Sequence, residues 1–343
     1  MADDTWPPPF DQITRLLDGL PSDTCGHVAC EVEAAGRRWP VPVFTLGSDD
    51  PTVPALGVFG GVHGLERIGF EVAIAFLGSL LQRLAWDDVL LHLLQGLRIV
   101  VMPLVNPGGL VRGTRANPQG VDLMRNAPVD CRDGAPWLVG GQRIGPGLPW
   151  FRGPEGAPMQ AEARALCEVV ERELLGRPFA LAVDCHSGFG LRDRLWFPHA
   201  HTVRPIEHLP ELHAFGQALD EAMLHHRYLL EPQSHQYLAH GDLWDHLYLG
   251  ALERPGSVFL PLTLEMGSWL WIKKNPRQLF SRHGIFNPLI EHRQQRVLRR
   301  HLGLLDFAMR AARSHRRWRP DAQSRETVRS AALARWYGVG WAA

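Results

Sequence analysis

Short apolar runs alternate with longer segments of helical periodicity along this chain. The apolar runs are bounded by glycine, proline and polar residues and predict buried strands, and they occupy residues 54–59, 97–104, 179–183 and 257–264. The longer segments repeat apolar residues three and four positions apart, which predicts amphipathic helices, and they occupy residues 68–84, 157–175, 291–313 and 325–337. Strands and helices that follow one another in this way are typical of α/β proteins.

The N-terminal part of the chain has a different pattern. Residues 10–20 have helical spacing and end in the sequence GLP, a common helix stop. Two strand-like segments, 27–34 and 39–46, flank the sequence AGRR at residues 35–38. This arrangement predicts a β-hairpin beside the alternating strands and helices.

Together these patterns predict an α/β fold with one mixed, twisted sheet and helices on both faces. The hydrophobic content of 45% over 343 residues is ample for such a core. No repeat, low-complexity tract or long linker interrupts the pattern before about residue 315. We therefore expect one domain at residues 1–315, followed by a basic helical tail at residues 316–343 that packs on this domain or extends from it.

Side chains able to bind a metal follow three of the predicted strands. The sequence GGVHGLE places His63 and Glu66 three residues apart at a helix start, where both can point to one side. His186 follows the strand at 179–183, and Glu265 follows the strand at 257–264. Each also has a structural explanation: the first pair can occur by chance, His186 can be a core histidine paired with Asp184, and Glu265 can mark an exposed strand end. Taken together, imidazole and carboxylate groups at strand ends indicate a metal site.

Arginines gather in the loop after the strand at 97–104. This loop is rich in Gly, Pro and Asn and contains Arg112, Arg115 and Arg125. A planar guanidinium group matches a carboxylate bidentately, so an anion-binding clamp is one interpretation, and a solvated loop with surface arginines is the other. The next loop, residues 128–156, is long, lacks periodicity and is rich in Gly, Pro and Trp, which is typical of a lid or a pocket wall.

Composition narrows the possible partners and compartments. Lys plus Arg equals Asp plus Glu at 36 each, which gives no electrostatic reason to expect nucleic acid or an anionic membrane as a partner. No apolar run is long enough to span a membrane, and the N-terminal sequence MADDTWPPP is not that of a signal peptide. Five scattered cysteines, an odd number, suit reduced thiols. We therefore expect a cytoplasmic protein without nucleic-acid or membrane partners, and its oligomeric state stays open.

Four ordered motifs resemble those of the zinc carboxypeptidases, also called the funnelin family. They are HGLE at residues 63–66, RANPQGVDLMRN at 115–126 after NPGG at 106–109, DCHS at 184–187 and TLE at 263–265. The resemblance covers about residues 10–310. It implies a carboxypeptidase-like fold for the domain at 1–315 and a hydrolase with one zinc ion per chain.

The resemblance also implies roles for individual residues. It makes His63, Glu66 and His186 the zinc ligands, which leaves a fourth position for water. It makes Glu265 the general base, Arg115 the group that polarises the scissile carbonyl, and Asp122 the carboxylate that orients the first histidine. The residues that it assigns to substrate binding are Arg125, Asn126 and Tyr248.

The chain departs from the family pattern at three places. Met124 stands where the family usually has Asn before the arginine that grips the substrate carboxylate, and Gly108 stands where it usually has Asp. Two tyrosines, Tyr237 and Tyr248, lie in the region of the family's active-site tyrosine, and we assign the role to Tyr248.

We expect a zinc-dependent hydrolase of amide bonds, a metallocarboxypeptidase that acts on small peptides. One alternative is a deacylase of N-acyl amino acids, like the aspartoacylase and succinylglutamate desuccinylase relatives. The long separation between Glu66 and His186 favours the peptidase over this alternative. The other alternative is a non-catalytic binding protein on the same scaffold, and the presence of all three ligands and Glu265 argues against it.

Overall fold

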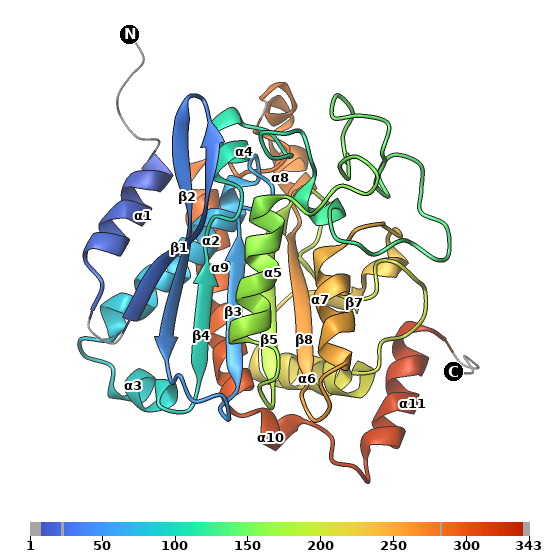
Figure 1. The fold of residues 1–343 in the computed structure, drawn as a ribbon. Helices are drawn as coiled ribbons and strands as arrows, with labels where there is room; N and C mark the ends of the chain where they lie inside the picture. The colour runs from blue at the N-terminus through green and yellow to red at the C-terminus, as the bar shows by residue number, and fades with distance from the viewer. Residues whose placement is uncertain (1–7, 22–23, 282, 339–343) are drawn as a thin grey trace.

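Eight strands form one mixed sheet in the computed structural model, which describes residues 8–21, 24–281 and 283–338 (Figure 1). The order of the strands across the sheet is β1 (Thr24–Ala34), β2 (Arg37–Gly47), β4 (Arg98–Met102), β3 (Ala55–Gly60), β5 (Ala180–Ser187), β8 (Phe259–Met266), β6 (Arg194–Phe197) and β7 (Leu229–Pro232). The central strands β4, β3, β5 and β8 run parallel. The hairpin β1–β2 continues the sheet antiparallel on one side, and β6 pairs antiparallel with β8 on the other.

Helices cover both faces of the sheet, as the sequence predicts. In Figure 1, α5 (Ala161–Glu173) and α7 (Leu243–Leu252) lie in front of the sheet, and α2 (Arg67–Arg83) and α9 (Glu291–Arg313) lie behind it. The other helices in the described residues are α1 (Pro8–Asp18), α3 (Asp88–Leu94), α4 (Pro107–Arg112), α6 (Leu209–Ala222), α8 (Trp269–Lys274), α10 (His315–Trp318) and α11 (Arg325–Trp336). Short 3₁₀ turns occupy Leu123–Arg125, Gln233–His235 and Pro276–Phe280.

The two central strands that carry site residues are buried along their whole length. All positions of β5 and β8 are buried, because helices cover both faces of the sheet here. A strand buried on both faces has a continuous apolar sequence instead of an alternating one. The polar side chains of these strands are concentrated toward the carboxyl ends, where the cavity described below begins.

The predicted elements are found, with some shifts at their ends. The predicted bounds of α9 are those of the structure, whereas α5 begins four residues later than the predicted helix at 157. Strands β5 and β8 extend past their apolar runs and include His186 and Glu265 themselves. The pattern did not predict α6, α7, β6 and β7. The last two are only four residues long, and α7 is apolar on most of its circumference, so that it has little helical periodicity.

The C-terminal segment packs against the rest of the chain. Helix α11 lies against α6, where Arg325 contacts Glu211 at 3.0 Å. The indole of Trp336, also on α11, donates to the carbonyl of Leu230 on β7 at 2.8 Å. A domain boundary near residue 315 stays a prediction.

None of the described helices is by itself long and apolar enough to cross a membrane. Helices α2 and α3 meet the criteria of length and composition only as a pair, which is bent by 110°.

A buried histidine on α9 predicts how the free energy of unfolding depends on pH. His301 is 1% exposed, and its Nδ1 lies 3.0 Å from the hydroxyl of Tyr228. Burial lowers the pKa of His301 from 6.5 to about 4, with Asp193 and Arg300 as smaller and opposing influences. Between these values the unfolded chain binds a proton that the folded chain does not, so stability falls as the pH falls through this window.

We expect His301 to make the protein about 2 kcal/mol less stable at pH 5 than at pH 7.5. His301→Asn keeps a hydrogen-bonding group near the position of Nδ1 and does not titrate, so this variant should lose less stability over the same range. Urea unfolding of both proteins at the two pH values measures the difference. An equal loss in parent and variant would show that His301 does not titrate as its burial requires.

Candidate metal centre and substrate pocket

A cavity of about 290 Å³ lies at the carboxyl ends of β3, β5 and β8. It brings together residues that are far apart in the sequence. Its polar lining includes His63, Glu66, Arg115, Arg125, His186, Gln233, Tyr237, Asp242 and Glu265. Val139 and Trp150 from the loop at 128–156 also line it, so the prediction that this loop is a pocket wall is confirmed.

A tight turn after β3 presents His63 and Glu66 to this cavity. Gly61 has φ +61°, in the left-handed region that favours glycine. A Cβ on Gly64 would lie 2.0 Å from the backbone carbon of Gly109, so only glycine lets the two loops pass this closely. Glu66 then ends the turn directly before α2 begins.

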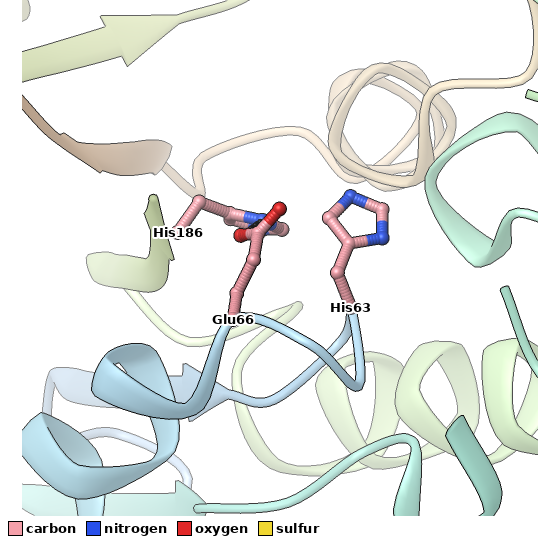
Figure 2. A group of neighbouring side chains, drawn as sticks. All are labelled: His63, Glu66 and His186. Carbon is pink, nitrogen blue, oxygen red and sulfur yellow. Dashed lines mark ion pairs between the residues drawn. The ribbon is translucent and has the colours of Figure 1, made fainter. Parts of the chain in front are cut away.

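His63, Glu66 and His186 form the cluster shown in Figure 2. Each offers a ligand atom, and these atoms all lie within 4.8 Å of one another. His63 and Glu66 rise from one turn, and His186 reaches them from β5 (Figure 2). All three are buried.

The cluster fits a zinc ion. Nδ1 of His186 lies 3.3 Å from Oε2 of Glu66, close to the roughly 3.4 Å expected between two ligands of tetrahedral zinc. Nδ1 of His63 is buried and has no hydrogen-bond partner among the described residues, a costly state for a polar atom that no metal satisfies. Two imidazoles and one carboxylate are also a donor set that zinc prefers.

A carboxylate orients the imidazole ring of His186, whereas the ring of His63 has no such bond to Asp122. Oδ2 of Asp184 lies 2.6 Å from Nε2 of His186 and also accepts the indole N–H of Trp244 at 2.8 Å. This contact leaves Nδ1 of His186 free on the side of Glu66. On the other ring, Oδ1 of Asp122 lies 3.8 Å from Nδ1 of His63, which is beyond hydrogen-bond distance.

The surroundings shift the pKa values of the two imidazoles in opposite directions. Burial, with Arg115 nearby, holds the pKa of His63 well below its ordinary value, so this ring is neutral and able to bind a metal. Burial would also lower the pKa of His186, but the carboxylates of Asp184 and Glu66 raise it well above the ordinary value. A metal cation beside His186 acts against that protonation.

Glu265 lies beside the cluster because of the register of two parallel strands. In this register His186 on β5 is the direct partner of Glu265 on β8, so both side chains leave the sheet at the same level and on the same face. Oε1 of Glu265 accepts the backbone N–H of Phe189 at 2.9 Å. Burial, and then the nearby Glu66, raise the pKa of Glu265 to about 8.

The two arginines in the cavity are held differently. Arg115 donates from Nε to Asp122 at 2.8 Å and from Nη1 to Glu66 at 3.1 Å, so it lies next to the cluster. Arg125 donates to the carbonyls of Met124 at 3.0 Å and Val139 at 3.3 Å, and its guanidinium lies 5.6 Å from the ring centre of Tyr237. The third arginine of the predicted clamp, Arg112, is exposed and bonds the carbonyl of Pro118 instead.

Comparison with known proteins identifies the family. Residues 34–253, well over half of the chain, match the family model described as zinc carboxypeptidase. The chain belongs to the zinc carboxypeptidase family. The predictions of this family and of a zinc cofactor are thereby confirmed, the second because the family's metal has a fitting His–Glu–His cluster in this chain.

Similar proteins of known sequence cover only part of the chain. Carboxypeptidase D of Drosophila melanogaster is 33% identical over 100 residues, and carboxypeptidase E of Caenorhabditis elegans is 34% identical over 97 residues. These matches cover 26% and 24% of this chain, but only 7% and 21% of the two relatives.

Solved structures share the fold over most of the chain. The thrombin-activatable fibrinolysis inhibitor has a TM-score of 0.64 at 18% identity and covers 88% of this chain and 72% of its own. Carboxypeptidase A of Helicoverpa armigera has a TM-score of 0.58 at 15% identity and covers 90% of this chain and 72% of its own. The predicted carboxypeptidase-like fold is therefore confirmed.

Tyr248 does not lie in the cavity, contrary to the prediction. It is fully buried on α7, and its hydroxyl accepts the backbone N–H of His208 at 3.1 Å. The tyrosine in the cavity is Tyr237, whose hydroxyl lies 3.5 Å from Nη2 of Arg125. Because α7 is apolar on most of its surface, its sequence does not show which side faces the cavity.

Asn126 is also not a lining residue, although it follows Arg125 directly. Its amide nitrogen donates to the carbonyl of Arg152 at 2.9 Å, and its amide oxygen accepts the N–H of Gln160 at 2.6 Å. The amide nitrogen of Asn126 thus holds the loop at 128–156, and its amide oxygen holds Gln160, the residue before α5. The assignment of Asn126 to substrate binding is corrected to a structural role.

Two residues that support the cluster were not recognised from the sequence in that role. The sequence marks Asp184 only as a possible partner of a core histidine, yet it contacts a histidine of the metal cluster. Asn287 lies far along the chain, and its side-chain oxygen accepts the N–H of Ile68 at 2.9 Å while its nitrogen donates to the carbonyl of Leu65 at 2.8 Å. Asn287 thereby caps the N-terminus of α2, where Glu66 makes no side-chain cap.

We expect Asn287→Ala to weaken zinc binding by about 10- to 100-fold, the range typical of residues that support metal ligands. The variant removes the two bonds from Asn287 to the segment between His63 and α2, so the spacing of the ligands is held less firmly. Asn287→Asp keeps the acceptor for Ile68 and loses the donor to Leu65, and should have an intermediate effect. Competition with a fluorescent chelator measures the zinc affinity.

Asn126→Ala is the matched control, because the amide of this asparagine likewise bonds backbone groups at both ends but holds a different loop. Its zinc affinity should equal that of the parent. Equal affinities of Asn287→Ala and the parent would show that the turn keeps its geometry without Asn287.

Proposed function

We propose that this chain is a zinc metallocarboxypeptidase that releases the last residue of small peptides. The observation that carries the proposal is that one cavity holds a buried His–Glu–His cluster, the carboxylate of Glu265 and the guanidinium of Arg125. The cavity of about 290 Å³ is at the small end of ligand pockets and suits one residue or a short peptide end.

His63, Glu66 and His186 are the residues that would hold zinc. The ion would supply a Lewis acid that polarises a carbonyl group and lowers the pKa of water. Glu265 is the general base: it accepts a proton from the attacking water and returns it to the nitrogen of the leaving residue. Its burial raises its pKa above the ordinary value, which favours a group that holds the proton before it returns it.

The two arginines would bind different groups of the substrate, one the carbonyl oxygen under attack and the other the terminal carboxylate. Arg115 stands beside Glu66 and would stabilise the oxygen of the carbonyl under attack. Arg125 would bind the terminal carboxylate. The carbonyl groups of Met124 and Val139 and the ring of Tyr237 fix its guanidinium, so little side-chain entropy is lost when the carboxylate binds.

The cytoplasmic location stays a prediction.

We expect the parent enzyme to cleave a peptide with a free terminal carboxylate faster than the same peptide as its amide. Arg125→Gln removes the charged partner, and a hydrogen bond to a charged group is worth about 1.5–3 kcal/mol. The kcat/KM for the free acid should therefore fall by about 10- to 150-fold, and that for the amide should change little. Steady-state kinetics on the matched pair of substrates measures both values.

Glu265→Gln serves as the control for chemistry, since it should lower kcat for both substrates by about 10²- to 10⁴-fold and retain zinc. Equal cleavage of acid and amide by the parent, with no effect of Arg125→Gln, would contradict a carboxypeptidase. Cleavage of N-acyl amino acids in place of peptides would identify the chain as a deacylase.

A further inference from the structure

A second cavity lies at the opposite edge of the sheet from the metal cluster. Its volume is about 360 Å³, and residues before β3, residues before β4 and the segment that joins α9 to α10 line it. In Figure 1, α10 lies below the sheet, at the end where β3 and β5 begin. The cavity is therefore separated from the metal cluster by the length of these strands.

The charged arginines that line this cavity have no partner in the described chain. Arg313, Arg316 and Arg317 line it, and no Asp or Glu among the described residues does. All three are exposed, and none makes a hydrogen bond or an ion pair with another described residue. By contrast, Arg310 on α9 pairs with Asp306 at 2.7 Å. Three guanidinium groups are thus available to a ligand.

The acidic residues of the turn before β3 are bound elsewhere. The carboxylate of Asp50 accepts the backbone N–H of Thr52 at 2.8 Å, and that of Asp49 pairs with Arg98. Arg177 adds a further positive group beside this turn, where it donates to the carbonyl of Asp50 at 2.7 Å. A recess lined by charges of one sign concentrates their field, so this cavity attracts an anion.

The guanidinium of Arg313 lies against the backbone at Gly96. A Cβ on Gly96 would lie 2.6 Å from Nε and 2.7 Å from Cζ of Arg313, so the guanidinium takes this position only because residue 96 has no side chain. Ordering a mobile arginine costs side-chain entropy when a ligand binds. The recess at Gly96 reduces this cost and distinguishes Arg313 from an ordinary surface arginine.

The charges of the arginines act together on a histidine of the cavity. His315 lines the cavity and is 4% exposed. Burial lowers its pKa to about 4, although its bond to the carbonyl of Ala312 acts in the opposite direction. The charges of Arg319, Arg316 and Arg313 lower the pKa further. The imidazole is therefore neutral near pH 7, and the positive charge of the cavity comes from arginines, which stay protonated there.

The excess of donors in the cavity indicates a ligand rich in acceptors. A guanidinium has five N–H donors and no acceptor, and the hydroxyl groups of Thr52 and Ser314 can also donate. A phosphate ester group carries nearly two negative charges and three acceptor oxygens, whereas a carboxylate has one charge and two oxygens. The planar fork of arginine matches phosphate geometry, and the volume of the cavity suits a small molecule.

We propose that this cavity binds a small molecule that carries phosphate groups, and that Arg313, Arg316 and Arg317 hold these groups. The inference does not depend on the proposed peptidase function, because the cavity lies at the amino ends of the strands whose carboxyl ends hold the metal cluster. It also gives a role to the basic residues at the start of the C-terminal tail, which the peptidase reaction does not use.

Calorimetric titration of the zinc-loaded protein with fructose 1,6-bisphosphate tests the proposal. At about 0.15 M salt, attraction between exposed charges is largely screened beyond roughly 8 Å. We expect the bisphosphate to bind under these conditions, fructose 6-phosphate to bind more weakly, and fructose not to bind. No binding of the bisphosphate would overturn the proposal. Equally tight binding of glucarate, a sugar diacid with two carboxylates, would overturn the assignment to phosphate.

Two variants test whether these residues form the site. The double variant Arg316→Gln/Arg317→Gln should bind the bisphosphate about 100-fold more weakly, at about 10-fold for each lost bond between charged groups, the low end of the range because these side chains are exposed. Gly96→Ala keeps the net charge, but its Cβ displaces the guanidinium of Arg313, so it should also bind more weakly. Affinity equal to that of the parent in either variant would overturn the proposed site.

The double variant Arg296→Gln/Arg299→Gln is the matched control for charge. Both arginines are exposed on α9 and line neither this cavity nor the metal cavity, so the affinity for the bisphosphate should equal that of the parent. A loss as large as that in Arg316→Gln/Arg317→Gln would reduce the effect to net charge and overturn the inference.

Arg125→Gln tests the metal cavity as a competing location, because the arginines there can also hold a phosphate. We expect this variant to bind the bisphosphate as the parent does. Binding that is lost in Arg125→Gln and kept in Arg316→Gln/Arg317→Gln would locate the ligand in the metal cavity and overturn the inference.

Discussion

The structure depends on a group of buried carboxylates around two imidazoles, only some of which pair with an arginine of the described chain. Four carboxylates surround the two imidazoles at the carboxyl ends of the central strands: Glu66 and Asp122, 2% and 1% exposed, and Asp184 and Glu265, 0% and 7% exposed. Arg115 pairs with two of them, but no second arginine reaches the others among the described residues. Buried charges of one sign are tolerated where a counter-charge binds between them, and a divalent cation at the cluster supplies it.

This constraint explains features of the fold that lie outside the cluster. Glu66 occupies the position from which a side chain would normally cap α2, but its oxygens face His186, Arg115 and the N–H of Ser187. The cap therefore comes from Asn287, and the segment that carries Asn287 is tied to the metal turn. Ser187 extends this connection, since its hydroxyl donates to the carbonyl of Phe286 at 2.7 Å.

Much of the site was predictable from the sequence because the candidate metal-binding and catalytic residues lie at or just after the ends of recognisable apolar strands. The buried runs that became β3, β5 and β8 are continuous and apolar, so a His or Glu where each run ends stands out against it. Parallel strands then bring their ends to one edge, which is why His186 and Glu265 become neighbours although they are far apart in the chain. The order of these residues also carries the resemblance to the family.

The sequence did not predict features that depend on which way a side chain points. Tyr237 and Tyr248 precede Glu265 in similar surroundings, and only the packing of α7 puts Tyr248 into the core and leaves Tyr237 in the cavity. Asn126 follows Arg125 directly, yet its amide is used by two backbone groups. The partners of Asn287 arise from contacts that local sequence patterns do not encode.

The central claim is that His63, Glu66 and His186 hold one zinc ion at the carboxyl ends of β3 and β5. Anomalous X-ray scattering at the zinc edge, from crystals of the zinc-loaded protein, tests this claim directly. We expect one strong peak per chain at bonding distance, about 2.0–2.2 Å, from a ligand atom of each of these three side chains. A zinc-loaded crystal with no peak at this position, or with its peak at another set of side chains, would contradict the claim.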